Sequence, residues 1–359
     1  MSEKSKETTS RKKVIWKKLR GFLAMVMVAV ISIVGTLAYL SRKTDPITNT
    51  FTATPDIDVT IDEPGFDPEG AKKYQPGVVY PKNPILKNTT EGNSTDDGEW
   101  VVIRVDYLVE DQGTDEDGKT TNTTKYTPWS YEDITNDVTV DNDAKGLINF
   151  NAKSKDDNQY IDDKYIEDNP KYTYTTEGIQ ALPGNTDSNW IRIDKEWLSD
   201  EVQDAMDAEN TENTTWKSEY YVYRYQLVPG KQDTVATKNT AGSLTSPLFQ
   251  NVVVKSQEQL IANGYAEAKD TEDEDEDESV LSKLPGFDIV VIGGAIKNSG
   301  DTTVTISNGV IDLDKLEDST SIDNNIVNQL VKLLVKENPT LNKSSNTEDS
   351  MGNETSNND

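Results

Sequence analysis

The chain has 359 residues, of which 34% are hydrophobic and 28% are charged, and its formal net charge at pH 7 is −28. It contains neither cysteine nor histidine. This excludes disulfide bonds, Cys/His zinc sites, thiolate nucleophiles and histidine general bases, so we expect a protein that is not an enzyme. Because an acidic surface repels nucleic acid and anionic membranes, we expect no nucleic-acid partner.

The first 40 residues carry the features of an export signal. Basic residues precede an apolar run at 21–40, and two small residues, Thr36 at −3 and Ala38 at −1, favour cleavage before Tyr39. The alternative is an uncleaved membrane anchor, because about 20 apolar residues can span a bilayer. Since the basic residues hold their side in the cytoplasm, the body is extracellular either way. We expect residues 1–38 to be a signal peptide, with signal peptidase as a partner during export and the membrane met only through this segment.

Residues 39–54 are predicted to form an extended N-terminal segment, because Pro46 and Pro55 disfavour a helix. Thr48, Thr50, Phe51 and Thr52 favour the β conformation and are uncharged, unlike most of the acidic body, and the segment becomes an N-terminus only after cleavage. It is therefore a candidate assembly element that adds as a strand to a neighbouring copy. The alternative is that Phe51 begins the first strand of the chain's own sheet. The candidate assembly residues are Thr48, Asn49, Thr50, Phe51 and Thr52.

Alternating apolar and polar residues predict β-strands along the body of the chain. At 100–109 the apolar residues share one face and Arg104 and Asp106 lie on the other, which indicates one buried and one solvated face. Further strands are predicted at 51–62, 220–228, 249–254, 287–292 and 302–306, with a turn at 74–77. We expect a mainly β protein, a jelly-roll-like antiparallel β-sandwich over residues 55–310 with helical and loop insertions.

Polar stretches interrupt this pattern. Insertions are expected near 110–189 and 267–283, and within the first of them 110–125 and 136–170 are predicted to be loops. Residues 341–359 have the composition of a disordered tail.

Two helices are predicted from capping residues. Ser199 precedes a short helix that carries Val202. Asp323 is predicted to cap a longer helix that ends before Pro339, inside a C-terminal helical region at 311–340.

Short acidic loops are weak candidates for calcium. Asp141 and Asp143 occupy the first and third positions of a loop, but Lys145 stands at the fifth and no glutamate at the twelfth, which excludes an EF-hand. Solvated turns are the simpler interpretation. We therefore expect no cofactor, with weak calcium binding as the alternative.

Four groups of residues stand in a recognisable order. They are the junction GTLAYLSRKTDPITNTFTAT at 35–54; Pro76-Gly77 with Lys82-Asn83-Pro84 and Asn88 before the strand at Trp100; the block 220–225 with Pro229-Gly230 and 246–249; and, more weakly, 287–296. In this order they resemble the TasA/camelysin family of biofilm-matrix and pilus-like proteins, which are exported through a SipW-type signal peptidase.

The resemblance implies a secreted subunit of an extracellular matrix or fibre, which associates with itself and with other matrix proteins. The name camelysin carries a metalloprotease claim, but a zinc hydrolase normally needs histidine ligands, which this chain lacks. The insertions and the residues after Pro339 depart from the family pattern. The alternative function is a monomeric cell-surface adhesin or ligand-binding module.

Overall fold

The computed structural model describes residues 50–53, 59–67, 71, 74–91, 98–114, 120–135, 146–161, 174–180, 188–211, 214–229, 233–265, 284–297 and 309–335. Several sequence expectations fall outside these residues. They are the cleavage region at Thr36, Ala38 and Tyr39; Thr48 and Asn49 of the assembly segment; the calcium candidates Asp141 and Asp143; the strand at 302–306; and the segments 267–283 and 341–359.

The protein is mainly β, and its largest sheet has six strands. Five lie in the order β1-β13-β5-β11-β10, and β6 pairs with the far end of β5. At the centre, β5 and β13 pair antiparallel along all of β13, from Phe287 opposite Val109 to Lys297 opposite Glu99. The strands are β1 (Thr50–Ala53), β5 (Glu99–Thr114), β6 (Thr120–Trp129), β10 (Trp190–Arg192), β11 (Glu219–Tyr223) and β13 (Phe287–Lys297).

Three smaller sheets complete the β structure. One has three strands in the order β3-β12-β7, and the other two are the pairs β2-β4 and β8-β9. Their strands are β2 (Val59–Asp62), β3 (Val79–Pro81), β4 (Ile85–Asn88), β7 (Ile148–Phe150), β8 (Lys153–Ser154), β9 (Tyr174–Thr175) and β12 (Asn251–Val254).

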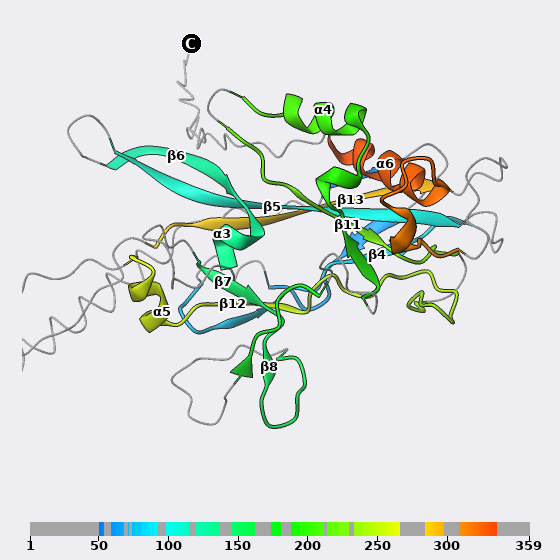
Figure 1. Ribbon diagram of the computed structural model, residues 1–359. Coiled ribbons are helices and arrows are strands. Elements are labelled where there is room, and N and C mark those ends of the chain that lie inside the picture. The colour runs from blue at the N-terminus through cyan, green and yellow to red at the C-terminus, as the bar shows by residue number, and fades with distance from the viewer. Residues whose placement is uncertain are drawn as a thin grey trace, which may run out of the picture.

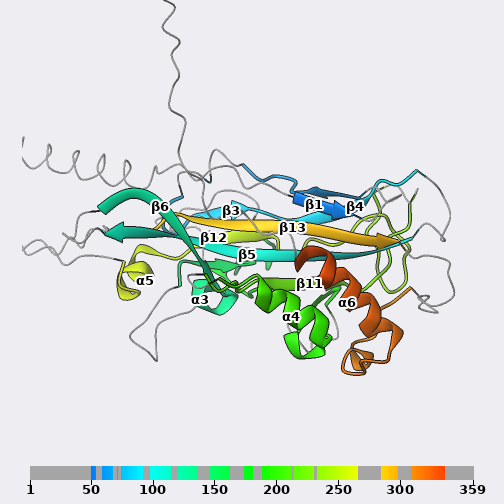
Figure 2. The same ribbon diagram turned by 90° about the horizontal axis from the view of Figure 1, so that it is seen from above.

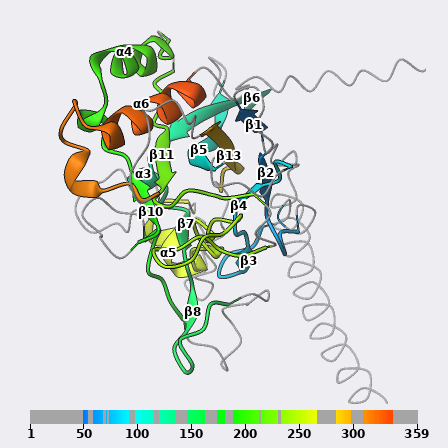
Figure 3. The same cartoon turned by 90° about the vertical axis from the view of Figure 1, so that its right-hand side faces the viewer.

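The two faces of the large sheet are covered differently. Helices α4 and α6 lie on one face, and the sheet that contains β7 and β12 lies on the other (Figure 1). The views from above and from the side show the same layers around β5 and β13 (Figures 2 and 3). The helices are α3 (Tyr131–Thr135), η2 (a 3-10 helix, Lys195–Trp197), α4 (Asp200–Ala208), α5 (Gln257–Ala262), η3 (a 3-10 helix, Leu313–Lys315) and α6 (Ile322–Val335).

Each face of β5 belongs to a different hydrophobic cluster. Ile103 and Tyr107 pack in the cluster that also holds Phe150 of β7, whereas Trp100 packs with Leu330 of α6. The period-2 pattern therefore predicted the strand correctly, since successive side chains point to opposite faces.

The expectation of a solvated face on this strand is wrong. Arg104 is 0% exposed and Asp106 is 2% exposed, because Arg104 contacts the Leu334 carbonyl of α6, Glu209 and Trp216, and Asp106 accepts from Ser218. The sequence indicated the helix but not the surface on which it docks. Two polar residues in an apolar strand were therefore assigned to solvent.

The observed strand pairs correct three other expectations about strands and loops. The stretch expected as one strand at 51–62 contains two strands in different sheets, β1 and β2. The loop expected at 110–125 contains the end of β5 and the start of β6, which pair antiparallel. The loop expected at 136–170 contains β7, which pairs with β12. Polar composition alone led to the expectation of loops. Strand β6 is rich in threonine, and β-branched residues favour strands even when they are polar.

The helix caps differ in detail from those expected. Ser199 is the N-cap residue of α4, but its side chain makes no capping hydrogen bond. Asp323 lies inside the first turn of α6 and accepts a hydrogen bond from the Asp312 amide at 2.7 Å. The hydroxyl of Ser321 accepts the Asn324 amide at 3.0 Å and so occupies the capping place.

The turn expected at 74–77 is confirmed. Gly77 has a φ of 69°, in the left-handed region that glycine enters without steric cost. In the part of the chain that the structure describes, no helix has the length and apolar character needed to cross a membrane.

Candidate functional site

The candidate assembly residues Thr50, Phe51 and Thr52 lie in β1, at the edge of the large sheet. β1 runs parallel to β13, with Thr50 opposite Ile292 and Phe51 opposite Gly293. All the other pairs between named strands of the described residues are antiparallel. Phe51 therefore lies in the chain's own sheet, as the alternative interpretation had it.

Two glycines in β13 keep space for the elements packed on either face. A Cβ atom on Gly293 would come within 2.8 Å of Ile61 Cδ1 and 2.9 Å of Leu86 Cδ2. A Cβ atom on Gly294 would come within 2.9 Å of Leu334 Cδ2 in α6. Gly293 and Gly294, which pair with β1, thus allow Ile61 and Leu86 to pack closely on one face of the sheet and α6 on the other.

The outer edge of β13 is only partly covered. β5 pairs with all eleven residues of β13 on one side. On the other side β1 pairs with residues 292–295. Within the described residues no strand pairs with 287–291 on that side. Main-chain groups at such a sheet edge form a template on which another strand can pair.

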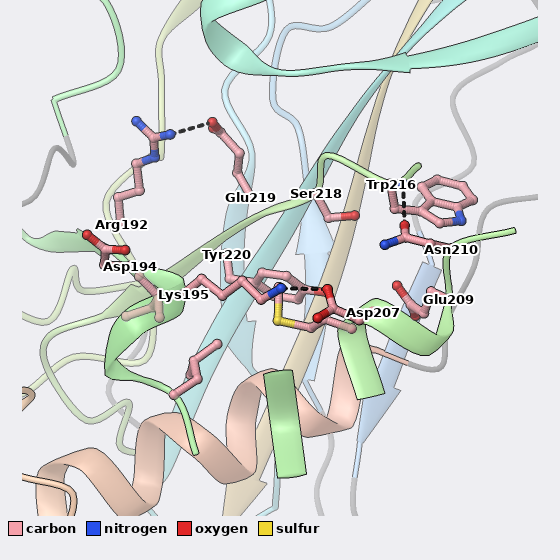
Figure 4. Close-up of a pocket in the computed structure, with 13 residues that line it drawn as sticks. Arg192, Asp194, Lys195, Asp207, Glu209, Asn210, Trp216, Ser218, Glu219 and Tyr220 are labelled. Carbon is pink, nitrogen blue, oxygen red and sulfur yellow. Dashed lines mark hydrogen bonds and ion pairs between the residues drawn. The ribbon is translucent and has the colours of Figure 1, made fainter. Parts of the chain in front are cut away.

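A second feature is a pocket of about 410 Å³ on the helical side of the sheet. Its walls come from η2, from the C-terminal end of α4 and from the chain that leads into β11 (Figure 4). Its lining is mostly polar, with two aromatic rings. The lining residues are Arg192, Ile193, Asp194, Lys195, Leu198, Met206, Asp207, Glu209, Asn210, Trp216, Ser218, Glu219 and Tyr220.

Ion pairs fix two sides of this pocket. Lys195 Nζ lies 2.5 Å from Asp207 Oδ1, which joins η2 to α4. Arg192 Nη2 lies 2.9 Å from Glu219 Oε1 and 3.0 Å from Glu132 Oε1. The pocket therefore presents fixed donors beside fixed acceptors.

Two carboxyl groups of the pocket have perturbed acidities. Burial raises the pKa of Glu219 to about 7, although Arg192 opposes the shift. Burial likewise raises the pKa of Glu209 to about 7, against the attraction of Arg104. Both groups thus change charge near neutral pH.

A buried network supports the pocket from the side of the sheet. Arg104 donates from Nε to Asp106 Oδ2 at 2.9 Å and from Nη1 to the Leu334 carbonyl at 3.0 Å. Its guanidinium also lies 5.3 Å from the ring centroid of Trp216, within the range of a cation–π contact. Ser218 donates to Asp106. The network links β5, α6 and the pocket wall.

Sequence reasoning missed this pocket. Its residues span 192–220, and they meet only because η2, α4 and β11 fold back on one another. The one available signal was the pair Arg104 and Asp106 inside an otherwise apolar strand, since charged residues in such a place need partners. That signal was assigned to a solvated face.

Among the residues that the structure describes, no group of three or more Asp or Glu side chains is placed to hold a metal ion. The arrangement offers hydrogen-bond donors, acceptors and aromatic surface. Such groups can form reversible hydrogen bonds and packing contacts with a small polar molecule.

Comparison of the chain with models of protein families, with curated proteins and with solved structures finds no match in any of the three.

Proposed function

We propose that this chain is a secreted structural subunit of an extracellular biofilm matrix or fibre, and that its copies associate by β-strand addition. The observation that carries the proposal is that, among the strands that the structure describes, β1 pairs with residues 292–295 of β13 and none pairs with residues 287–291 on the same side. Asp288, Ile289 and Val291 are buried at this edge, so an added segment has to displace what covers them before it pairs with residues 287–291 through main-chain hydrogen bonds. The protein acts in this proposal as a structural component and not as an enzyme.

The segment before β1 in a neighbouring copy has the properties of the added strand. It carries the uncharged residues Thr48 and Asn49 and leads into a strand that is parallel to β13 of its own copy. If the added segment takes the same parallel register that β1 has within its own chain, with Thr50 opposite Ile292, the neighbour's Thr48 would stand opposite Val290. Cleavage before Tyr39 frees this segment outside the cell, which delays assembly until export.

The sequence supports the same proposal independently. The junction at 35–54 resembles that of the TasA/camelysin family, whose members are matrix and pilus-like proteins. The antiparallel sheets on the two sides of the Ile103–Phe150 cluster are compatible with a jelly-roll-like β-sandwich, and we include that topology in the proposal. Signal peptidase and other matrix proteins complete the proposed partners.

Truncation tests the proposal. The chain that begins at Tyr39 should form fibres in negative-stain electron microscopy. The chain that begins at Thr50 keeps β1, so it should stay folded by circular dichroism but form no fibres. A matched control begins at Tyr39 and lacks 342–359, and it should still form fibres. Normal fibres from the chain that begins at Thr50 would refute the proposal.

The pocket favours a second candidate function, a monomeric cell-surface adhesin or ligand-binding module. A polar pocket of about 410 Å³ lies within the range of small-ligand sites. Sedimentation of the chain that begins at Tyr39 separates the candidates. A single monomeric species at all concentrations supports the module, and a concentration-dependent polymer supports the fibre subunit.

A further inference from the structure

Two ion pairs of the pocket each place a hydrogen-bond donor beside an acceptor. Lys195 Nζ and Asp207 Oδ1 lie 2.5 Å apart, and Arg192 Nη2 and Glu219 Oε1 lie 2.9 Å apart. Each hydroxyl group both donates and accepts. Neighbouring hydroxyls of a sugar ring are about one hydrogen-bond length apart, so one can accept from the cation while the next donates to the carboxylate.

An aromatic ring lies among these polar groups. Trp216 is half-buried, and its backbone amide donates to Asn210 Oδ1 at 2.8 Å (Figure 4). The indole ring of Trp216 also makes a cation–π contact with the guanidinium of Arg104. The indole is thus fixed before any ligand arrives, which lowers the entropic cost of binding. Aromatic faces pack well against the C–H face of a pyranose ring.

The charges of the lining select against ionic ligands. Four carboxyl side chains line the pocket, namely Asp194, Asp207, Glu209 and Glu219, and they oppose anions. A cationic ligand would in turn compete with Lys195 and Arg192, which already hold Asp207 and Glu219. A neutral ligand brings no charge of its own, and its hydroxyls can share the donor and the acceptor of the Lys195–Asp207 pair.

We propose that the pocket between η2, α4 and β11 binds one pyranose unit of an uncharged saccharide, with the Lys195–Asp207 pair holding neighbouring hydroxyls and Trp216 packing on the ring. This site lies on the helical side of the sheet, and it does not depend on strand addition at β13. It gives the chain a means of holding a neutral polysaccharide.

Calorimetric titration of the chain that begins at Tyr39 tests the site. The probes are maltotriose, cellotriose and the trimer of N-acetylglucosamine, with glucosamine and galacturonic acid as charged comparisons. At least one neutral probe should bind with one site per chain. Its affinity should change little between about 0.05 and about 0.5 M sodium chloride, since no ion is exchanged.

Substitutions locate the site. Asp207→Ala and Trp216→Ala should each weaken binding by about tenfold or more. The Asp207 side chain is 61% exposed, so its removal leaves the fold intact even if Trp216→Ala unfolds the protein. Tyr160→Ala is the matched control, because Tyr160 is an exposed aromatic residue beside Lys153, outside the pocket. It should bind as the parent chain does.

Three results would overturn the proposal. The first is that no neutral probe binds. The second is that only glucosamine or galacturonic acid binds, with an affinity that salt abolishes. The third is that Asp207→Ala binds the neutral probe as tightly as the parent chain.

Discussion

Arg104 and Asp106 stand two residues apart on the same face of β5, and they form an ion pair of 2.9 Å between Nε and Oδ2 with side-chain exposures of 0% and 1%. Buried charges of this kind are stable only with their partners. The pair also reaches α6 through the Leu334 carbonyl. The sheet, the C-terminal helix and the pocket wall therefore depend on one network.

Breaking this pair should destabilise the protein strongly. Arg104→Met leaves Asp106 as a buried charge without its cation, so the free energy of unfolding should fall by about 3–5 kcal/mol. Urea unfolding at pH 6 measures the change. The double variant Arg104→Met, Asp106→Leu removes both charges and should recover most of the loss. Equal losses in the single and double variants would contradict this account.

Helix α6 should contribute to stability through its buried face. Leu330 is 0% exposed in the cluster with Trp100, so Leu330→Ala should cost about 2–5 kcal/mol in the free energy of unfolding. Lys332 is an exposed residue of the same helix, and Lys332→Ala is the control that should cost much less. If both variants unfold at the same urea concentration as the parent chain, the helix does not cover the sheet.

A methyl group added at Gly293 should destabilise the protein, and a second substitution that removes the clashing atom should restore part of the stability. Gly293→Ala places a methyl group within 2.8 Å of Ile61 Cδ1, and overpacking of this kind typically costs about 1–3 kcal/mol. Ile61→Val removes that δ-carbon. The double variant should therefore recover part of the melting temperature that Gly293→Ala loses. A double variant that is less stable than both single variants would argue against the contact.

Glu219 should make stability depend on pH. Its pKa is about 7 in the folded protein against 4.5 for an ordinary glutamate, so the folded state binds the proton more tightly than the unfolded state does. The contribution of Glu219 to stability is therefore complete below about pH 4.5, is lost as the pH rises to about 7, and changes little above that.

The variant Glu219→Gln isolates this effect, because other carboxyl groups add their own pH dependence. The difference in free energy of unfolding between variant and parent should shift in favour of the variant between pH 4.5 and pH 7. Asp207→Asn, in the same pocket, is the matched control. A difference that stays constant with pH would contradict the raised pKa.

Much of the fold could be predicted from local pattern. β5, β11, β12 and β13 were expected from alternation and β-branched residues, and the helix at Ile322–Val335 from apolar spacing. These strands carry their own signal because they are dense in apolar and β-branched residues, and the helix because its apolar residues recur along one side. The polar strand β6 carries no such signal, and its backbone pairing with β5 could not be read from composition.

The pocket could not be predicted for a different reason. Lys195 and Asp207 meet because η2 and α4 turn toward each other, and tertiary contacts of this kind leave no periodicity in the sequence. Phe51 was read as a candidate for assembly or for the first strand, and the structure places it in β1. The burial of Arg104 depended on α6, which follows it by more than 200 residues.

In the proposed fibre, the segment before β1 pairs with β13 of another copy. Because the chain contains no cysteine, a disulfide can report this pairing directly. If the added segment takes the register of β1, Thr48 of one copy would stand opposite Val290 of the next, close enough for a disulfide bond across a strand pair. Two single variants, Thr48→Cys and Val290→Cys, are prepared with different masses and oxidised together.

Strand addition between copies should give a disulfide-linked heterodimer of the two single variants, seen by mass spectrometry, and no such product with chains that begin at Thr50. A disulfide that forms only within one chain of the double variant Thr48→Cys, Val290→Cys, with no heterodimer from the mixture, would contradict strand addition between copies.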